Sequence, residues 1–81
     1  MQVRVHFYSY FGDLAGCAET ELAVPPPGRI ADLLAAVHTQ FPGLAPMAKS
    51  TLVAVGVEYQ DRNYILKPGD EVSLFPPVQG G

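Results

Sequence analysis

One segment of the chain, residues 29–41, has the spacing of an amphipathic helix, whereas the other patterned segments are short and typical of strands. Its apolar residues recur at intervals of three and four, which places them on one helical face. The members of that face are Ile30, Leu33, Leu34, Val37 and Phe41. Gly28 is the expected N-cap, Asp32 suits the positive end of the helix dipole, and Pro42-Gly43 ends the helix. A chain with one such segment needs a sheet to bury that face.

The strand-like segments supply that sheet, as four to five strands. Near the N-terminus Val3, Val5 and Phe7 alternate with Arg4, His6 and Tyr8, which is the period of a strand with one buried face. The other predicted strands cover residues 19–24, 51–55, 57–60 and 71–75.

Glycine and proline mark the connections between these strands. Residues 10–17 contain Gly12 and Gly16 and are expected to form a loop, and the stretch around Pro46 is expected to be irregular. Residues 61–63 and 67–70 are predicted turns, the second because it contains Pro-Gly.

The order of elements predicts an α+β fold of the β-grasp type, a mixed sheet of four to five strands packed on one main helix. A hairpin is expected to join the first two strands, and the strand after the helix is expected to run parallel to a neighbour. We expect the β-grasp domain to cover residues 1–75 and a flexible diglycine tail to cover residues 76–81.

Size and charge exclude several functions. A chain of 81 residues has little core to spare for a substrate cavity, so a self-sufficient enzyme is disfavoured. A net charge of −3 with only five Lys and Arg residues argues against nucleic-acid binding. A single cysteine, with no signal-peptide pattern and no long apolar run, predicts a cytoplasmic protein without a membrane span.

Side chains that could carry chemistry are few. His6 is expected on the outward face of the first strand, and His38 at the edge of the helix. Cys17 is expected in the loop, where nothing nearby in sequence would activate it as a nucleophile. No spacing of cysteine, histidine and carboxylates predicts a metal site.

The C-terminal residues Gly80 and Gly81 follow a rigid Pro76-Pro77. Without side chains they could enter a narrow channel, and the terminal carboxylate could itself be the reacting group. A frayed terminus is the alternative interpretation of the same residues.

Residues 66–81, Leu-Lys-Pro-Gly-Asp-Glu-Val-Ser-Leu-Phe-Pro-Pro-Val-Gln-Gly-Gly, resemble the C-terminus of the small subunit of molybdopterin synthase. This family belongs to the ubiquitin-like sulfur carriers. The resemblance extends more weakly to Phe7-Tyr8, to residues 14–16 and to residues 31–34. Two features depart from it: Gly56 stands where many relatives have asparagine, and residues 25–28 precede the helix where a serine or threonine cap is usual.

The resemblance implies a sulfur carrier that is a non-catalytic subunit of an enzyme and binds no cofactor. An adenylyltransferase related to ubiquitin-activating enzymes would use ATP to adenylate Gly81, and a sulfur donor protein would convert it to a thiocarboxylate. The tail would then enter the large subunit of molybdopterin synthase and donate sulfur to a cyclic pyranopterin phosphate. Gly80 would give the tail clearance, and the implied docking residues are Phe75, Pro76, Pro77 and Val78.

Other functions share this chemistry or this fold. The chain could carry sulfur for tRNA thiolation, cysteine or thiamine biosynthesis, because the partners set the product. It could also be a protein modifier joined to lysines through Gly81, or an interaction module without covalent chemistry.

Overall fold

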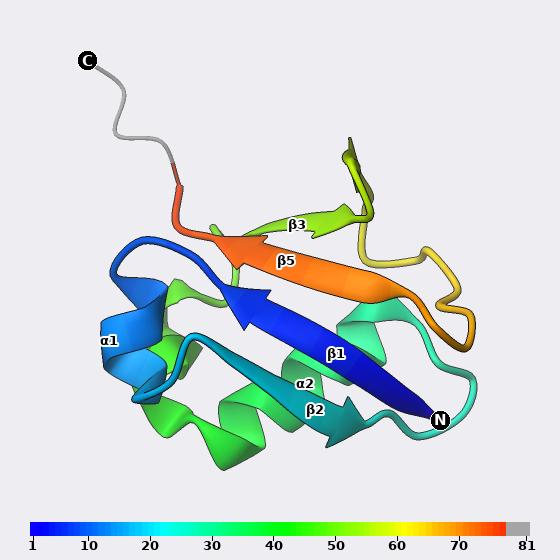
Figure 1. The fold of residues 1–81 in the computed structure, drawn as a ribbon, viewed down its shortest axis with the longest axis horizontal. Helices are drawn as coiled ribbons and strands as arrows, with labels where there is room; N and C mark the ends of the chain where they lie inside the picture. The colour runs from blue at the N-terminus through cyan, green and yellow to red at the C-terminus, as the bar shows by residue number, and fades with distance from the viewer. Residues whose placement is uncertain (78–81) are drawn as a thin grey trace.

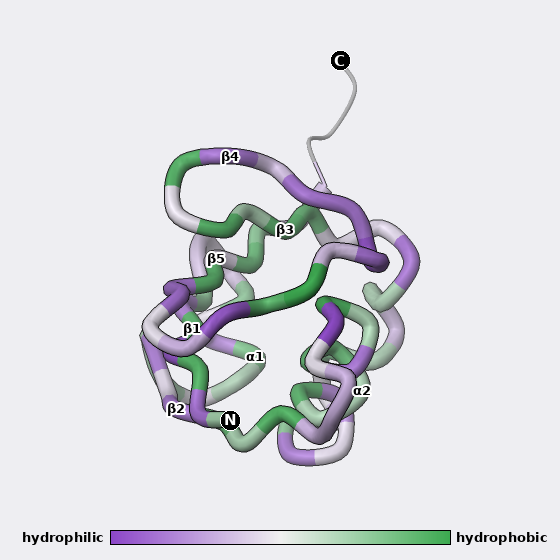
Figure 2. The backbone as a smooth tube through the Cα atoms, turned by 90° about the vertical axis from the view of Figure 1, so that its right-hand side faces the viewer, coloured by the Kyte–Doolittle hydropathy of each residue, from purple (hydrophilic) through white to green (hydrophobic). Residues whose placement is uncertain are grey.

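The computed structural model describes residues 1–77 and consists of a five-stranded mixed sheet packed against one long helix. The strands are β1 (Gln2–Phe7), β2 (Glu19–Ala23), β3 (Leu52–Val55), β4 (Glu58–Tyr59) and β5 (Glu71–Phe75). The helices are α1 (Phe11–Ala15), α2 (Ile30–Gln40) and the 3-10 helix η1 (Pro42–Met47). Figures 1 and 2 show the sheet and α2 as two layers. The predicted β-grasp architecture is confirmed.

The sheet has the strand order β2-β1-β5-β3-β4, so the first and last strands lie side by side at its centre (Figure 1). β1 and β5 are parallel, and every other pair is antiparallel. The expected β1–β2 hairpin is confirmed. The expectation that the strand after the helix is parallel to a neighbour is wrong, because β3 lies between β4 and β5 and runs antiparallel to both. The parallel pairing is made by β5 instead.

The core lies between the sheet and α2, and the apolar stripe of the helix faces it as predicted. Ile30, Leu33, Leu34 and Val37 are buried, while Phe41 is half-buried and packs edge-to-face on Phe7, 5.2 Å between ring centroids. The sheet supplies the opposite wall through its inward residues, which include Val3, Val5, Leu22, Val53, Val72 and Leu74. Burial of this face, more than helix propensity, stabilises α2.

The start of α2 differs from the prediction. The N-cap is Arg29 and not Gly28. The cap is stabilised by Asp32, whose carboxylate accepts a hydrogen bond of 2.9 Å from the Arg29 backbone N–H. Asp32 thus satisfies a backbone donor at the helix start and also places a negative charge at the positive end of the helix.

Two connections are more regular than expected. The segment predicted as a loop contains the helix α1, which buries Phe11 in the core, and the irregular stretch around Pro46 is the 3-10 helix η1. Gly12 disfavours a helix, but the burial of Phe11 offsets that cost. Gly16 ends α1 with a φ of +80°, a left-handed conformation that glycine adopts without strain.

Two turns have the geometry that their glycines predict. Gly69 has a φ of +88°, and the Asp70 N–H closes the turn on the Lys67 carbonyl at 3.0 Å. Gly56 links β3 to β4 with a φ of +61°. Glycine adopts this left-handed conformation without strain, and asparagine, which the resemblance leads one to expect here, tolerates it better than most residues.

Candidate functional site

β5 ends at Phe75 and leads directly into Pro76 and Pro77, so the predicted tail begins at the centre of the sheet. These three predicted docking residues are all half-buried. The predicted site residues Val78, Gly80 and Gly81 lie outside the described residues. The structure therefore describes the surface around Phe75, Pro76 and Pro77, where the predicted tail begins.

The outward face of β5 carries Phe75 between two exposed tyrosines. The Tyr8 ring is stacked on Phe75 with centroids 4.8 Å apart and planes 14° apart. The Tyr59 ring meets Phe75 edge-on at 6.1 Å and 65°. We call Tyr8, Tyr59 and Phe75 the aromatic patch. The two tyrosines are 45% and 67% exposed, so the three rings form a contiguous aromatic surface, which is the kind of patch that marks an interaction site.

Phe75 is predicted from the sequence as part of this site, whereas Tyr8 and Tyr59 are not. The alternation of β1 placed Tyr8 on the outward face, although nothing in it indicated a contact with residue 75. Tyr59 enters the patch because β4 pairs with β3, where it lies opposite Ala54. That hairpin is local, but the pairing of β3 with β5, which brings Tyr59 near Phe75, is a long-range feature that periodicity does not encode.

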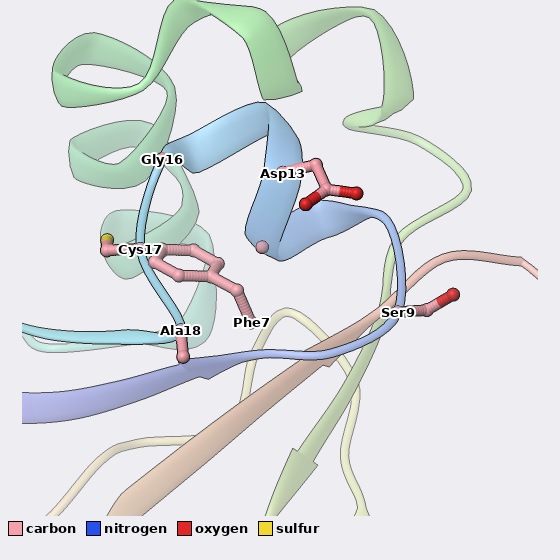
Figure 3. Close-up of a pocket in the computed structure, with 7 residues that line it drawn as sticks. Phe7, Ser9, Asp13, Gly16, Cys17 and Ala18 are labelled. Carbon is pink, nitrogen blue, oxygen red and sulfur yellow. The ribbon is translucent and has the colours of Figure 1, made fainter.

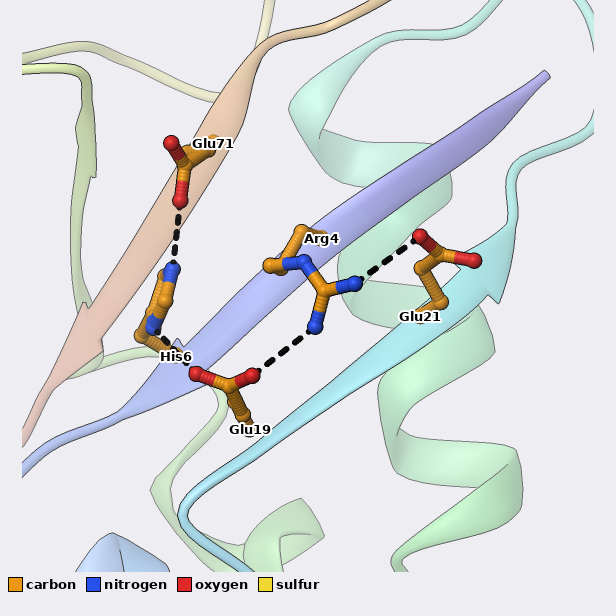
Figure 4. Close-up of polar contacts among 5 residues, drawn as sticks. All are labelled: Arg4, His6, Glu19, Glu21 and Glu71. Carbon is orange, nitrogen blue, oxygen red and sulfur yellow. Dashed lines mark hydrogen bonds and ion pairs between the residues drawn. The ribbon is translucent and has the colours of Figure 1, made fainter.

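Next to the aromatic patch, the outward face of β2, β1 and β5 carries a charged cluster (Figure 4). Arg4 contacts Glu19 at 2.8 Å and Glu21 at 3.1 Å. His6 contacts Glu71 at 2.8 Å through Nε2 and Glu19 at 3.4 Å through Nδ1. The expected outward position of His6 is confirmed. Arg4 and the three glutamates are 42–63% exposed, so the ion pairs of Arg4 contribute little to stability individually, whereas His6 is only 24% exposed.

His38 and Arg62 lie apart from this face. Arg62 donates hydrogen bonds of 2.9 Å to the backbone carbonyls of Ala48 and Thr51, and so ties the segment before β3 to the segment after β4. Burial, with a smaller contribution from the nearby Arg62 guanidinium, lowers the pKa of His38 below its usual value. His38 is half-buried, as expected for a helix-edge residue that packs against its surroundings.

A depression of about 480 Å³ lies beside α1 and is lined by Phe7, Ser9, Gly12, Asp13, Gly16, Cys17 and Ala18 (Figure 3). It contains the predicted loop cysteine, which is half-buried and packs against the core. Neither histidine is among the lining residues, so Cys17 has no imidazole beside it to act as a base. The depression therefore lacks the arrangement needed for nucleophilic catalysis.

Residues 1–77 contain no group of three or more His, Cys, Asp or Glu side chains that could hold a metal ion. No helix among these residues is both long enough and apolar enough to cross a bilayer.

Comparison with known proteins decides the family. The model described as the ThiS family matches residues 5–81. The chain belongs to the ThiS family. The match includes the C-terminal residues that lie outside the described part of the structure. The sulfur carrier resemblance noted in the sequence is thereby confirmed at the level of the family.

Curated relatives of this ThiS-family chain are named molybdopterin synthase sulfur carrier subunit. The one from Homo sapiens is 31% identical over 99% of this chain and 94% of its own length. The one from Chlamydomonas reinhardtii is 33% identical over the whole of both chains. Both names agree with the family that the tail residues indicated.

Solved structures agree with the fold. A putative molybdopterin converting factor subunit 1 from Pyrococcus furiosus superposes with a TM-score of 0.86 at 28% identity, covering 96% of this chain and 99% of that one. A chain in the complex of subunits 1 and 2 of the molybdopterin-converting factor from Helicobacter pylori superposes with a TM-score of 0.69 at 27% identity, covering all of both chains. That relative is thus known in association with a second subunit.

Proposed function

We propose that this chain is the sulfur carrier subunit of a molybdopterin synthase, with the Gly81 carboxylate as the group that carries sulfur. The observation that supports this most is the match of the ThiS family through residue 81, which includes Gly80 and Gly81. The curated relatives named above support the same pathway. The fold contributes a stable body with a central strand that leads straight into the tail.

The chemistry requires partners, because the described residues offer no catalytic arrangement of their own. An adenylyltransferase joins AMP from ATP to the Gly81 carboxylate, with release of pyrophosphate. A sulfur donor at the oxidation level of sulfide then forms the C–S bond while the bond to AMP breaks. The resulting thiocarboxylate donates its sulfur to a cyclic pyranopterin phosphate in the large subunit. ATP is a substrate of the activating partner and not a cofactor of this chain.

The docking surface proposed for these partners is the aromatic patch together with Pro76 and Pro77, continued by Val78 in sequence. Its rings present apolar area next to the start of the tail. Desolvation of exposed aromatic rings is a common source of binding energy at protein interfaces. The Helicobacter pylori relative, solved in a complex with subunit 2, supports the large subunit as one such partner.

Intact-mass spectrometry tests the proposed chemistry. The chain is incubated with its adenylyltransferase, ATP and a sulfur donor, and we expect a mass increase of one oxygen-to-sulfur exchange that maps to Gly81. Deletion of Gly81 should abolish the increase, whereas the circular dichroism spectrum should stay unchanged because the core lies between Val3 and Leu74. An unmodified wild-type chain, with partners active on a related carrier, would contradict the proposal.

A further inference from the structure

The aromatic patch has an intramolecular geometry that contact with a partner does not require. Phe75 is the last residue of β5, and the two tyrosines reach it from opposite sides, Tyr8 from the β1 side and Tyr59 from the β3–β4 side. Both centroid distances, 4.8 and 6.1 Å, lie in the range where aromatic pairs attract one another. Phe75 is therefore held by rings on both flanks.

Tyr8 is fixed relative to β5 by its backbone as well as by its ring. Its N–H donates a hydrogen bond of 3.1 Å to the Leu74 carbonyl, one residue beyond the end of β1. The chain then turns away at Ser9, which has a φ of +56°. Tyr8 is thus the last residue of this segment that lies alongside β5, at the level of Phe75.

Tyr59 reaches Phe75 across a row of small side chains. It lies opposite Ala54 on β3, and Ala54 lies opposite Ser73 on β5. Neither Ala54 nor Ser73 is large enough to fill the space above the sheet, so the Tyr59 ring can lean toward Phe75. Leu52, directly opposite Phe75 on β3, completes the surroundings of the ring.

We propose that Tyr8 and Tyr59 are positioning residues that fix the direction in which the chain leaves the sheet at Phe75. This inference rests on the proposed function, in which Gly81 must reach a reacting group on a partner. Pro76 and Pro77 follow Phe75 immediately, and proline restricts φ to about −65°. An orientation set at Phe75 is therefore transmitted along the first two residues of the tail. A reactant held in a favourable direction loses less entropy on reaching the transition state.

Kinetics separate positioning from direct contact with the partner. A residue that only contacts the partner contributes equally to the bound ground state and the transition state, so its loss raises KM and leaves kcat unchanged. A residue that aligns the tail acts mainly on the reactive geometry, so its loss lowers kcat. A residue that only stabilises the fold alters neither constant once the folded fraction is taken into account.

The experiment measures kcat and KM for thiocarboxylate formation, with this chain as the varied substrate of its adenylyltransferase and sulfur donor. We expect Tyr8→Leu and Tyr59→Leu to lower kcat by roughly tenfold, in addition to the rise in KM that loss of their docking contact produces. Tyr8→Phe keeps the stacked ring and should retain the wild-type kcat. Tyr10→Leu is the matched control, since Tyr10 is similarly exposed (42%) but packs on Phe11 and not on Phe75.

A second measurement examines the free chain by NMR. In the wild type and in Tyr8→Phe, the Phe75 ring protons should be shifted upfield by the stacked neighbour, and Tyr8→Leu should remove this shift. This readout needs no partner and also reports whether each variant is folded.

The outcomes separate the two proposals. Sulfuration of the wild type together with an unchanged kcat in both leucine variants, or a raised KM alone, overturns the positioning role and leaves the proposed function standing. Absence of the upfield shift in the wild type overturns the stacking of Tyr8 on Phe75, and with it the positioning role. A wild-type chain that gains no sulfur overturns the proposed function, and with it the positioning role.

Discussion

At the scale of single residues, Arg62 and His38 show how the polar groups outside the charged cluster are accommodated. The Arg62 guanidinium donates hydrogen bonds to two partly buried backbone carbonyls, which would cost stability if they had no donor. Its positive charge lies near enough to His38 to disfavour a second positive charge there. The same arginine therefore stabilises a connection and restrains protonation of the histidine.

The lowered pKa of His38 predicts a dependence of stability on pH. Because the folded state binds this proton more weakly than the unfolded state, the contribution is complete above the unfolded pKa of about 6.5. This contribution to the free energy of unfolding is lost as the pH falls from about 6.5 through the folded-state pKa of His38. Below that pKa, His38 no longer changes the stability further. Urea unfolding of the wild type and His38→Gln between pH 7.5 and 4.5, values chosen to span about 6.5, should show a smaller decline for the variant.

The Arg62→Met background provides the control for that measurement. Removal of the guanidinium takes away one of the two causes of the lowered pKa of His38. In this background the pH dependence of the chain that keeps His38 should therefore come closer to that of the chain with His38→Gln. An identical pH dependence in wild type and His38→Gln would show that His38 does not contribute.

At the scale of elements, the start of α2 depends on a side chain three residues inside the helix. Asp32 accepts the Arg29 N–H and lies in the first turn, while Arg29 itself makes no side-chain cap. The helix begins one residue later than Gly28 would have placed it. Gly28 follows the three prolines, and its carbonyl accepts a hydrogen bond of 2.8 Å from the Leu66 N–H. Gly28 thus links the segment before α2 to the segment before β5 and does not cap the helix.

Asp32→Ala should lower the free energy of unfolding by about 0.5–2 kcal/mol, because it removes both the cap and the favourable charge. Asp13→Ala is the matched control, since Asp13 also lies in the first turn of a helix but makes no hydrogen bond of this kind within the described structure. Urea denaturation followed by circular dichroism measures both. Equal losses in the two variants would show that charge alone, and not the hydrogen bond, is responsible.

At the scale of the whole molecule, the central position of β5 joins stability to function. β5 pairs with β1 on one side and β3 on the other, and it turns Val72 and Leu74 into the core while Phe75 faces outward. The strand that leads into the tail is therefore paired along both edges and buries its inward side chains in the core. The tail departs from a fixed point because that strand is held on both edges.

Leu74→Ala should cost about 2–5 kcal/mol, since it leaves a cavity at a position only 1% exposed. For a chain of 81 residues this is a large part of the roughly 4–12 kcal/mol expected in total. Ser73→Ala, the outward neighbour on the same strand, should change stability by less than about 0.5 kcal/mol. Chemical denaturation measures the free energy of unfolding of both variants. Similar losses in Leu74→Ala and Ser73→Ala would contradict the assignment of Leu74 to the inward face and Ser73 to the outward face of β5.

The local pattern of the sequence accounts for much of this molecule. The three-to-four spacing predicted the buried face of α2, and alternation predicted the buried faces of β1 and β2. Pro-Gly predicted the turn before β5, and the residues up to Gly81 indicated the family. Each of these depends on neighbours within a few residues, and short-range periodicity records them directly.

The tertiary structure decided what joins distant segments. The parallel pairing of β1 with β5, the helix α1 formed around buried Phe11, and the approach of Tyr8 and Tyr59 to Phe75 have no local signal. His6 and Glu71 meet although 65 positions separate them. Such contacts form because the whole chain must bury its apolar faces at once, and only the shared core fixes which strands become neighbours.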